Sequence, residues 1–194
     1  MHALTKTSLS IIILAILVGT QLTACVPVVL GGAAAGGAMA ADRRTSGIYI
    51  EDAAIELKAG KAIADSLKDS IHVNITSFNR QVLITGEVSN EANKNKAESL
   101  VKPIENVASI KNYLEISPNS SISSRTKDAY ITSKVKANFI KENKFAANYV
   151  KVTTENSTVY LLGLVTHKEG DDAVEIARSI SGVKTVVKIF EYID

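Results

Sequence analysis

Apolar and polar residues repeat along most of this chain with two different periods, and these predict helices and strands in a fixed order. In residues 51–67, and again in 126–143, apolar side chains recur every three or four positions, as on a helix with one buried face. An alternating stretch, a polar turn and a second apolar stretch follow each time, which predicts a β-hairpin. The pattern also predicts a later helix in each half, at 91–101 and 168–180, and a final strand, at 107–116 and 183–193.

The two halves of this pattern are copies of one unit. A shift of 77 residues places 82–88 on 159–165, with Gly86 on Gly163. We therefore predict an α+β protein with two α-β-β-α-β domains, at 46–117 and 124–194, joined by a polar linker at 118–123. Each three-stranded sheet must bury one face under its two helices. Domains of this size are near the lower limit of independent stability, so we expect the copies to pack together.

Glycine at the matching positions 86 and 163, near the end of a predicted strand, indicates a structural requirement. Glycine at such a place suits a bulge, a positive φ or the close approach of a neighbouring element.

The first 24 residues have the pattern of a secretory signal peptide. Residues 11–18 form an unbroken apolar run, preceded by Lys6, and this run is less than half of the roughly 20 residues that a spanning helix needs. Leu22-Thr23-Ala24-Cys25 then resembles the lipobox of bacterial lipoproteins, and Cys25 is the only cysteine. The resemblance implies that Cys25 becomes the first mature residue and carries fatty acyl chains such as palmitate. The alternative is an ordinary signal peptide, or a short uncleaved anchor, with an unrelated cysteine.

Residues 25–45 connect this cysteine to the first domain. Residues 30–41 contain only Gly and Ala apart from Leu30 and Met39, which predicts a flexible tether. The alternative is a stripe of small residues, at Gly32 and Gly36, that contacts the bilayer. Val26 follows the cysteine, and by the sorting rule of enterobacterial lipoproteins this implies transport to the outer membrane, with the protein facing the periplasm.

The order of elements in both copies resembles the BON domain (bacterial OsmY and nodulation). The likeness covers nearly all of 46–194 and is strongest in 150–165 and in Ser181-Gly182-Val183-Lys184. A lipobox, a tether and two such domains are together similar to the dual-BON lipoproteins of the outer membrane. This resemblance implies phospholipid binding and support of envelope integrity, without catalysis.

Composition and motifs exclude several other functions. The chain is 46% hydrophobic and 22% charged with a net charge of +2, which argues against wholesale disorder and against a general nucleic-acid binder. No catalytic, cofactor or metal site is expected, because the chain has no GxxxxGK[ST] or GxSxG motif, and because His72 and His167 fall in different copies. The acidic residues Glu169, Asp171 and Asp172 suit the first turn of a helix.

Charge distinguishes the two copies. Residues 46–117 carry a net charge of −2 and residues 121–194 a net charge of +2. Residues 125–144 alone carry +4, whereas the corresponding residues 51–68 carry −1. In the second copy's first helix, Ile131, Val135 and Phe139 share the expected core face. A neighbouring stripe consists of Lys127, Tyr130, Lys134, Ala137 and Lys141.

We predict that this stripe binds anionic phospholipid. An aromatic ring among lysines suits an anionic membrane surface, with the ring at headgroup depth. The resemblance adds that in the dual-BON lipoproteins this helix contacts phospholipid and has an aromatic residue at the position of Tyr130. The alternative is that the lysines form only a solvated face, with Tyr130 covering part of the seam between the domains. In that case the protein would be an adaptor for outer-membrane assembly or cell-division proteins; a binder of small ligands in an inter-domain groove has no supporting feature.

Overall fold

The computed structural model describes residues 42–67 and 72–194. The signal peptide predicted at 1–24, the lipidated Cys25 and the tether before residue 42 lie outside the described residues. The first domain contains α3 (Ser46–Leu67), β1 (His72–Phe78), β2 (Gln81–Val88), α4 (Glu91–Val101) and β3 (Ser109–Ile116). The second contains α5 (Ile122–Glu142), a 3₁₀ turn η1 (Ala147–Tyr149), β4 (Val150–Glu155), β5 (Thr158–Val165), α6 (His167–Ser179) and β6 (Thr185–Tyr192).

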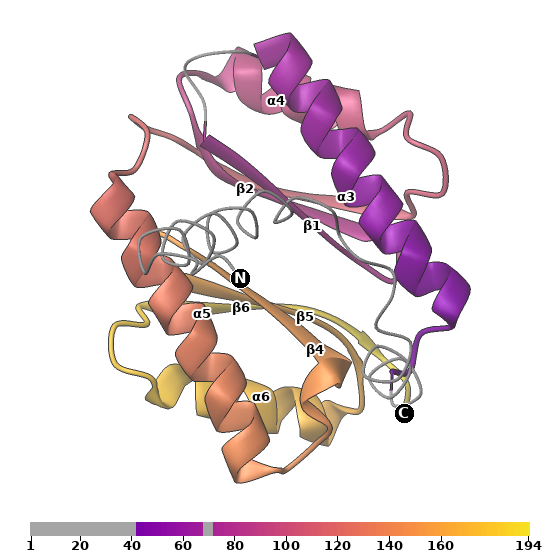
Figure 1. Cartoon of the computed structure of the whole chain (residues 1–194), viewed down its shortest axis with the longest axis vertical. Helices are drawn as coiled ribbons and strands as arrows, with labels where there is room; N and C mark the ends of the chain where they lie inside the picture. Colours follow the sequence, from indigo (N-terminus) through magenta and orange to yellow (C-terminus); the bar gives the residue numbers. More distant parts are fainter. Residues whose placement is uncertain (1–41, 68–71) are drawn as a thin grey trace, which may run out of the picture. The chain divides into compact units, whose positions relative to one another are not determined.

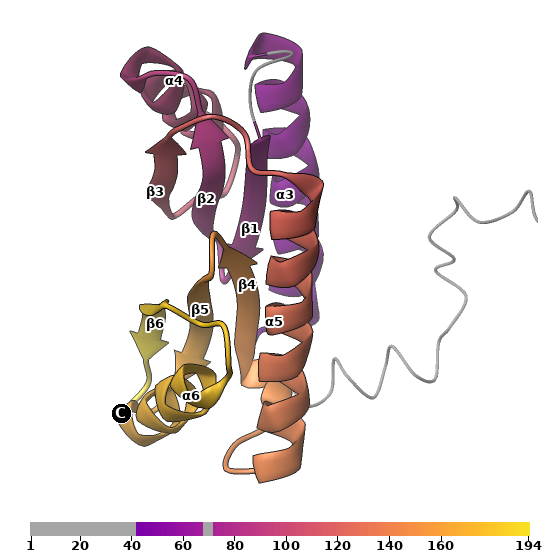
Figure 2. The same ribbon diagram turned by 90° about the vertical axis from the view of Figure 1, so that its left-hand side faces the viewer.

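Both domains have the predicted α-β-β-α-β order and a three-stranded sheet. The strand orders are β1-β2-β3 and β4-β5-β6, as Figure 2 shows. In each sheet the hairpin is antiparallel and the last strand runs parallel to the central one. Val82 pairs with Ile110 in the first sheet and Val159 pairs with Val186 in the second, so the central and last strands pair in a similar register in both domains.

The first helix of each domain is longer than its apolar pattern predicted. α3 begins at Ser46 rather than at residue 51, and α5 begins at Ile122, inside the segment 118–123 that was predicted as linker. The side chain of Ser121 accepts a hydrogen bond from Ser124 N and so caps α5. Ile122 is 83% exposed, so this first turn is held by the cap and not by burial. The spacing of the apolar residues therefore does not show that the helix begins here.

Each sheet is covered on one face by its own two helices. In the first domain the covered core includes Ile55, Ala59 and Ile63 of α3 against Val82 and Ile84 of β2. The corresponding core of the second domain is built from the following residues: Ile131, Val135 and Phe139 of α5, Val159 and Leu161 of β5, Ala173 and Ala177 of α6. Ile131, Val135 and Phe139 are at most 1% exposed, which confirms their predicted core face.

Both hairpins turn through two residues with positive φ. Asn79 and Arg80 have φ of 50° and 64°, and Asn156 and Ser157 have φ of 48° and 63°. Positive φ at both central positions defines a type I′ turn, whose twist matches that of the two flanking strands. The turns therefore fix the register of β1 on β2 and of β4 on β5.

A buried aspartate on the first helix of each domain holds the turn. Asp52 Oδ2 and Oδ1 accept hydrogen bonds from the backbone N–H groups of Asn79 and Arg80, both at 2.8 Å. Asp128 does the same for Asn156, at 3.0 Å, and Ser157, at 2.8 Å. The two aspartates are only 2% and 4% exposed, so each hairpin is attached to its helix through charge-assisted hydrogen bonds.

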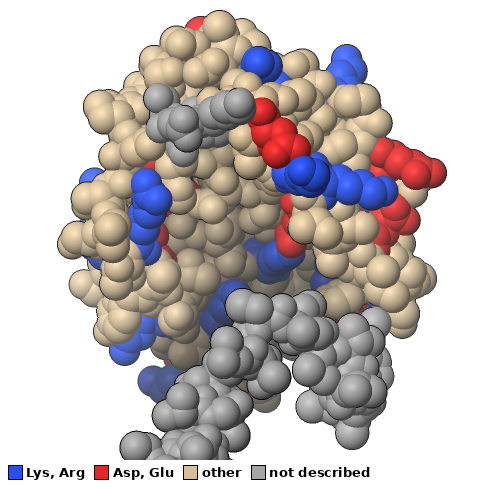
Figure 3. Space-filling model, turned by 45° about the horizontal axis from the view of Figure 1, so that its top comes forward, with Lys and Arg blue, Asp and Glu red and all other residues tan. Residues whose placement is uncertain are grey.

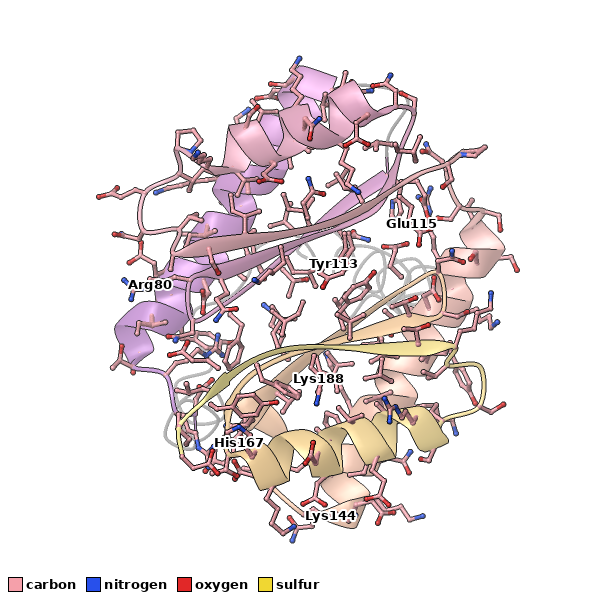
Figure 4. All side chains as sticks on the ribbon, turned by 180° about the vertical axis from the view of Figure 1, so that it is seen from behind. Arg80, Tyr113, Glu115, Lys144, His167 and Lys188 are labelled. Carbon is pink, nitrogen blue, oxygen red and sulfur yellow. The ribbon has the colours of Figure 1, made fainter. Side chains whose placement is uncertain are left out.

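The faces of the two sheets that carry no helix meet at an inter-domain seam. Both domains belong to one compact unit, Ala38–Asp194. In Figure 1 the two sheets lie between the helix pair α3 and α4 and the helix pair α5 and α6. A shared apolar cluster fills part of this seam; it consists of Phe78, Leu83, Tyr160, Leu162 and Ile189. Figure 4 shows Tyr113 between the sheets, where its ring makes an edge-to-face contact with Tyr160 at 5.3 Å between centroids.

Gly86 and Gly163, the glycines at matching positions of the two copies, lie inside the second strand of their domains. Each lies close to a backbone oxygen of another element. Gly86 has φ +116°, and a Cβ at this position would lie 1.9 Å from His72 O. Gly163 lies against the 3₁₀ turn, where a Cβ would lie 2.8 Å from Tyr149 O. Glycine is therefore required at position 86 by its positive φ, and at position 163 by the close approach of the backbone at Tyr149.

Candidate functional site

The first helix of the second domain presents one buried and one exposed face. Its buried face, Asp128, Ile131, Val135 and Phe139, covers the sheet. The predicted lipid-binding stripe lies on the other side and all its members are exposed: Lys127, Tyr130, Lys134, Ala137 and Lys141. The structure therefore places these five residues together on a surface that no other described element covers.

Within this stripe an aromatic ring lies beside a free cation. Tyr130 is 59% exposed, and Lys134 Nζ lies 5.4 Å from the centroid of its ring, within range of a cation–π interaction. Among the ion pairs of residues 42–67 and 72–194, none involves Lys127, Lys134 or Lys141. Their charges are therefore available to an external anion. In Figure 3 most charged side chains at the left-hand edge, where Figure 1 places α5, are blue.

The equivalent helix of the first domain has a different surface. Lys61 Nζ on α3 is paired with Asp65 at 2.7 Å, and Glu56 on the same helix accepts a hydrogen bond from Lys151 Nζ at 2.6 Å. Exposed apolar side chains on α3 are Tyr49, Ile50 and Leu57. In Figure 3 blue and red side chains are mixed at the right-hand side, where Figure 1 places this helix. The basic excess is thus confined to one of two equivalent helices.

Both domains match one family model. The model of the BON domain matches residues 51–118 and again residues 127–194, which together make up most of the chain.

The chain belongs to the BON domain family.

Three relatives show which BON proteins resemble this chain. The outer membrane lipoprotein DolP of Haemophilus influenzae is 40% identical over 185 residues, which cover 93% of this chain and 96% of that protein. The 21 kDa hemolysin of Actinobacillus pleuropneumoniae is 27% identical, with 78% and 79% of the two chains covered. Osmotically-inducible protein Y of Escherichia coli is 28% identical, with 72% of each chain covered. This chain is therefore a DolP-like protein with two BON domains and a lipid-anchored outer-membrane location.

The described part of this BON protein holds no candidate for a transmembrane span. None of the helices in residues 42–67 and 72–194 combines the length and the apolar character that crossing a bilayer requires.

An exposed apolar residue on α5 was missed by the sequence analysis. Ile140 is 70% exposed and lies on the helix surface next to Ala137. The signal for it was available, because its spacing from Phe139 and Val135 places it outside the core face. Ile140 and Tyr130 are thus two exposed apolar side chains on this helix of the second BON domain.

The two buried aspartates were also missed. Asp52 and Asp128 occupy matching positions of the two BON domains, each three residues before a core isoleucine, Ile55 and Ile131. An acidic residue in phase with the apolar face of a helix is rarely left unpartnered. This pattern, present twice, was the signal that could have identified them.

The acidic residues near the start of α6 have structural partners. Glu169 and Thr166 form a capping box at the N-terminus of α6. Arg43 donates hydrogen bonds to both oxygens of Glu169, and this contact lowers the pKa of that carboxyl group. Lys168 pairs with Asp172 at 2.6 Å and lowers its pKa in the same way. His167 Nδ1 lies 2.7 Å from Asp194 Oδ1, whereas His72 belongs to β1 of the other domain.

Three further polar side chains that the sequence did not connect meet at the inter-domain seam. They are His72 of β1, Glu87 of β2 and Glu155 of β4, and one ligand atom of each lies within 4.8 Å of the others. A groove of about 550 Å³ borders His72 and Glu155 and is lined on its other side by Arg125, Asp128 and Thr132 of α5. No metal site was predicted from the sequence, because His72 and His167 fall in different copies. The three side chains that meet here come from three strands, β1, β2 and β4.

Proposed function

We propose that this chain is a lipid-anchored protein of the outer membrane, facing the periplasm, whose second BON domain binds anionic phospholipid and supports the integrity of the envelope. The observation that carries the proposal is the exposed face of α5. There Tyr130 is 59% exposed, with Lys134 beside its ring, and Lys127 and Lys141 continue the stripe.

The residue types on this face suit a charged bilayer surface. Lysine ammonium groups can meet lipid phosphates, each contributing about 1 kcal/mol near an anionic surface. A tyrosine ring is stable at the boundary between headgroups and acyl chains, because one end is apolar and the other is polar. Ile140, which is 70% exposed, adds an aliphatic side chain to the same surface.

With the proposed acyl anchor, even weak binding of α5 to lipid is enough to keep this helix on the membrane surface. We propose that Cys25 carries the acyl chains, which would keep the domain at the bilayer whether or not α5 is bound. Binding of α5 then becomes an intramolecular event with a high effective concentration of lipid. The likeness to an outer membrane lipoprotein supports this arrangement.

Vesicle binding tests the proposal without the anchor. Residues 42–194 contain both hydrophobic cores, so a form lacking residues 1–25 keeps the folded domains. We expect it to sediment with phosphatidylglycerol vesicles and not with phosphatidylcholine vesicles. Lys134→Glu should reduce this binding strongly. The control is Lys58→Glu on α3, because Lys58 is also exposed but lies on the helix without a basic excess.

Salt dependence separates the aromatic from the basic contribution. The lysine contribution should fade as ionic strength rises, because salt screens exposed charges beyond a Debye length of about 8 Å at physiological strength. Tyr130→Ala should weaken binding at high salt as well, because insertion of a ring is not screened. Equal losses from Lys134→Glu and Lys58→Glu, or no loss from either, would contradict the lipid site and favour an adaptor that binds proteins.

A further inference from the structure

Three potential metal ligands meet at the inter-domain seam, away from the α5 stripe. His72 of β1 and Glu87 of β2 are register partners in the first sheet, and Glu155 is the last residue of β4 in the second. One ligand atom of each lies within 4.8 Å of the others. We propose that His72, Glu87 and Glu155 bind one Zn²⁺ ion, which joins the two BON domains.

The residue types and their separation fit this ion. Zn²⁺ accepts imidazole nitrogen and carboxylate oxygen, whereas Ca²⁺ and Mg²⁺ favour oxygen ligands alone. His72 Nε2 lies 3.4 Å from Glu155 Oε1. This is longer than a charge-assisted hydrogen bond, at about 2.7–2.9 Å. It is close to the separation of about 3.4 Å between two ligands that each lie about 2.0–2.1 Å from a tetrahedral zinc ion.

The charges around the cluster favour a cation. Glu87 is 3% exposed and Glu155 is 7% exposed, so two carboxylates are buried side by side. The basic side chain that lines the groove, Arg125, donates its hydrogen bonds to Ser120. A divalent ion would neutralise the two buried carboxylates, whose charge is otherwise costly to bury.

Neighbouring polar groups orient the proposed ligands. Asn74 Nδ2 donates to Glu155 Oε2 at 2.8 Å, and Ser120 N donates to Glu87 Oε2 at 3.1 Å. Such outer hydrogen bonds are typical of metal ligands, because they fix the direction of each carboxylate. Asn74 Nδ2 also lies 3.2 Å from His72 Nε2. An N–H donated to this nitrogen occupies the lone pair that Zn²⁺ needs, so binding of the ion requires this one contact to break.

Two further observations fit a ligand at this place. The groove beside the cluster provides a route from solvent and room for a water molecule in the fourth coordination position. Thr85, on the same face of β2 as Glu87, has a buried hydroxyl group without a hydrogen-bond partner in the described part of the chain. Protein groups of the described part of the chain therefore do not provide every hydrogen bond that the polar face of β2 at the seam can make.

Titration of the full-length protein in detergent tests the site. After removal of metal with EDTA, we expect calorimetry to show one Zn²⁺ bound per chain and thermal unfolding to shift to higher temperature when Zn²⁺ is added. Glu155→Gln should weaken this binding by at least about 100-fold, since loss of even an outer hydrogen bond costs about 10–100-fold. His72→Ala should weaken it similarly, and Co²⁺ should give the visible absorption of a tetrahedral site only in the wild type.

The metal-free stability distinguishes loss of the site from loss of the fold. Glu155→Gln removes a buried negative charge, so without metal the variant should melt at the same or a higher temperature than the wild type, while its shift with Zn²⁺ disappears. His167→Ala serves as the control, because this histidine is exposed and bonded to Asp194. Lys134→Glu, which alters the lipid stripe, should bind Zn²⁺ normally. Absence of stoichiometric binding, or binding that both His72→Ala and Glu155→Gln retain, would overturn the proposal.

Discussion

Arg43 donates hydrogen bonds to both carboxylate oxygens of Glu169, at 2.7 and 2.8 Å, although the two residues are 126 positions apart. The guanidinium carbon of Arg43 also lies 3.8 Å from the centroid of the Tyr149 ring. The next residue turns to the other domain: Arg44 donates to Asp52 at 2.8 Å in a buried ion pair. The two residues Arg43 and Arg44, just before α3, therefore contact both BON domains.

Removal of the Arg43 contact should lower stability in a pH-dependent way. Glu169→Gln keeps a side chain that can complete the capping box but loses the ion pair. We therefore expect the free energy of unfolding, measured with urea at neutral pH, to fall by about 1 kcal/mol. Arg43 lowers the pKa of Glu169. The stabilisation is thus fully present above the ordinary glutamate pKa and is lost as the pH falls through the lowered value. The difference between wild type and variant should shrink over that range.

The exposed pair of Lys61 and Asp65 provides the control for this measurement. Its side chains are 74% and 64% exposed, so Lys61→Ala should leave the free energy of unfolding nearly unchanged. An equal effect of Lys61→Ala and Glu169→Gln would contradict a specific role for the Arg43 contact.

The buried aspartates should be among the most sensitive polar positions of the fold. Asp128→Ala leaves two backbone N–H groups of the second hairpin turn without their acceptor, so we expect a loss of about 2–3 kcal/mol in urea unfolding. Asp52→Ala should cost more, about 3–5 kcal/mol, because it also leaves the buried Arg44 without one of its carboxylates. Asp171→Ala, whose side chain is 77% exposed, should cost less than about 0.5 kcal/mol. Similar small losses at all three positions would show that the turns form without these acceptors.

Alanine at Gly86 should destabilise the first domain strongly. Its φ is +116° and a Cβ would lie 1.9 Å from a backbone oxygen, so both strain and steric conflict oppose the change. We expect a loss of about 3 kcal/mol or more. Gly163→Ala should cost less, because that residue meets its nearest backbone oxygen at 2.8 Å. Gly60→Ala, with no atom within 4 Å in the middle of α3, should stabilise the protein by about 0.5–1 kcal/mol. Thermal unfolding of the three variants should give this order, and a harmless Gly86→Ala would contradict it.

Cys25 should decide whether the protein stays with the membrane. Cys25→Ser removes the proposed site of acylation, and the apolar run at 11–18 is too short to span a bilayer. We expect the variant to leave the membrane fraction after a salt wash, while the wild type remains in it. Complete retention of the variant would rule out the lipobox. Fractionation with immunodetection is sufficient for this comparison.

The sequence by itself determined the local architecture of each domain. Periodicity predicted the two helices and three strands of each domain in order, with a hairpin between the first two strands, because burial of one face of an element sets the spacing of its apolar residues. Comparison of the copies showed that this order occurs twice. The same geometry identified the stripe of Lys127, Tyr130, Lys134, Ala137 and Lys141 as the surface next to the core face of this helix. Bounds were less well predicted where caps replace burial, as at Ile122.

Only the tertiary structure decided what the second face of each sheet contacts. β2 is buried on both faces from Val82 to Val88. Because Thr85 and Glu87 on its seam side are polar, the sequence pattern does not predict that this second face is buried. Contacts such as Arg43 with Glu169, and the meeting of His72, Glu87 and Glu155, join residues of different elements. Hydrogen bonds and charge pairs leave no period along the chain, because each depends on where two separate elements meet after folding.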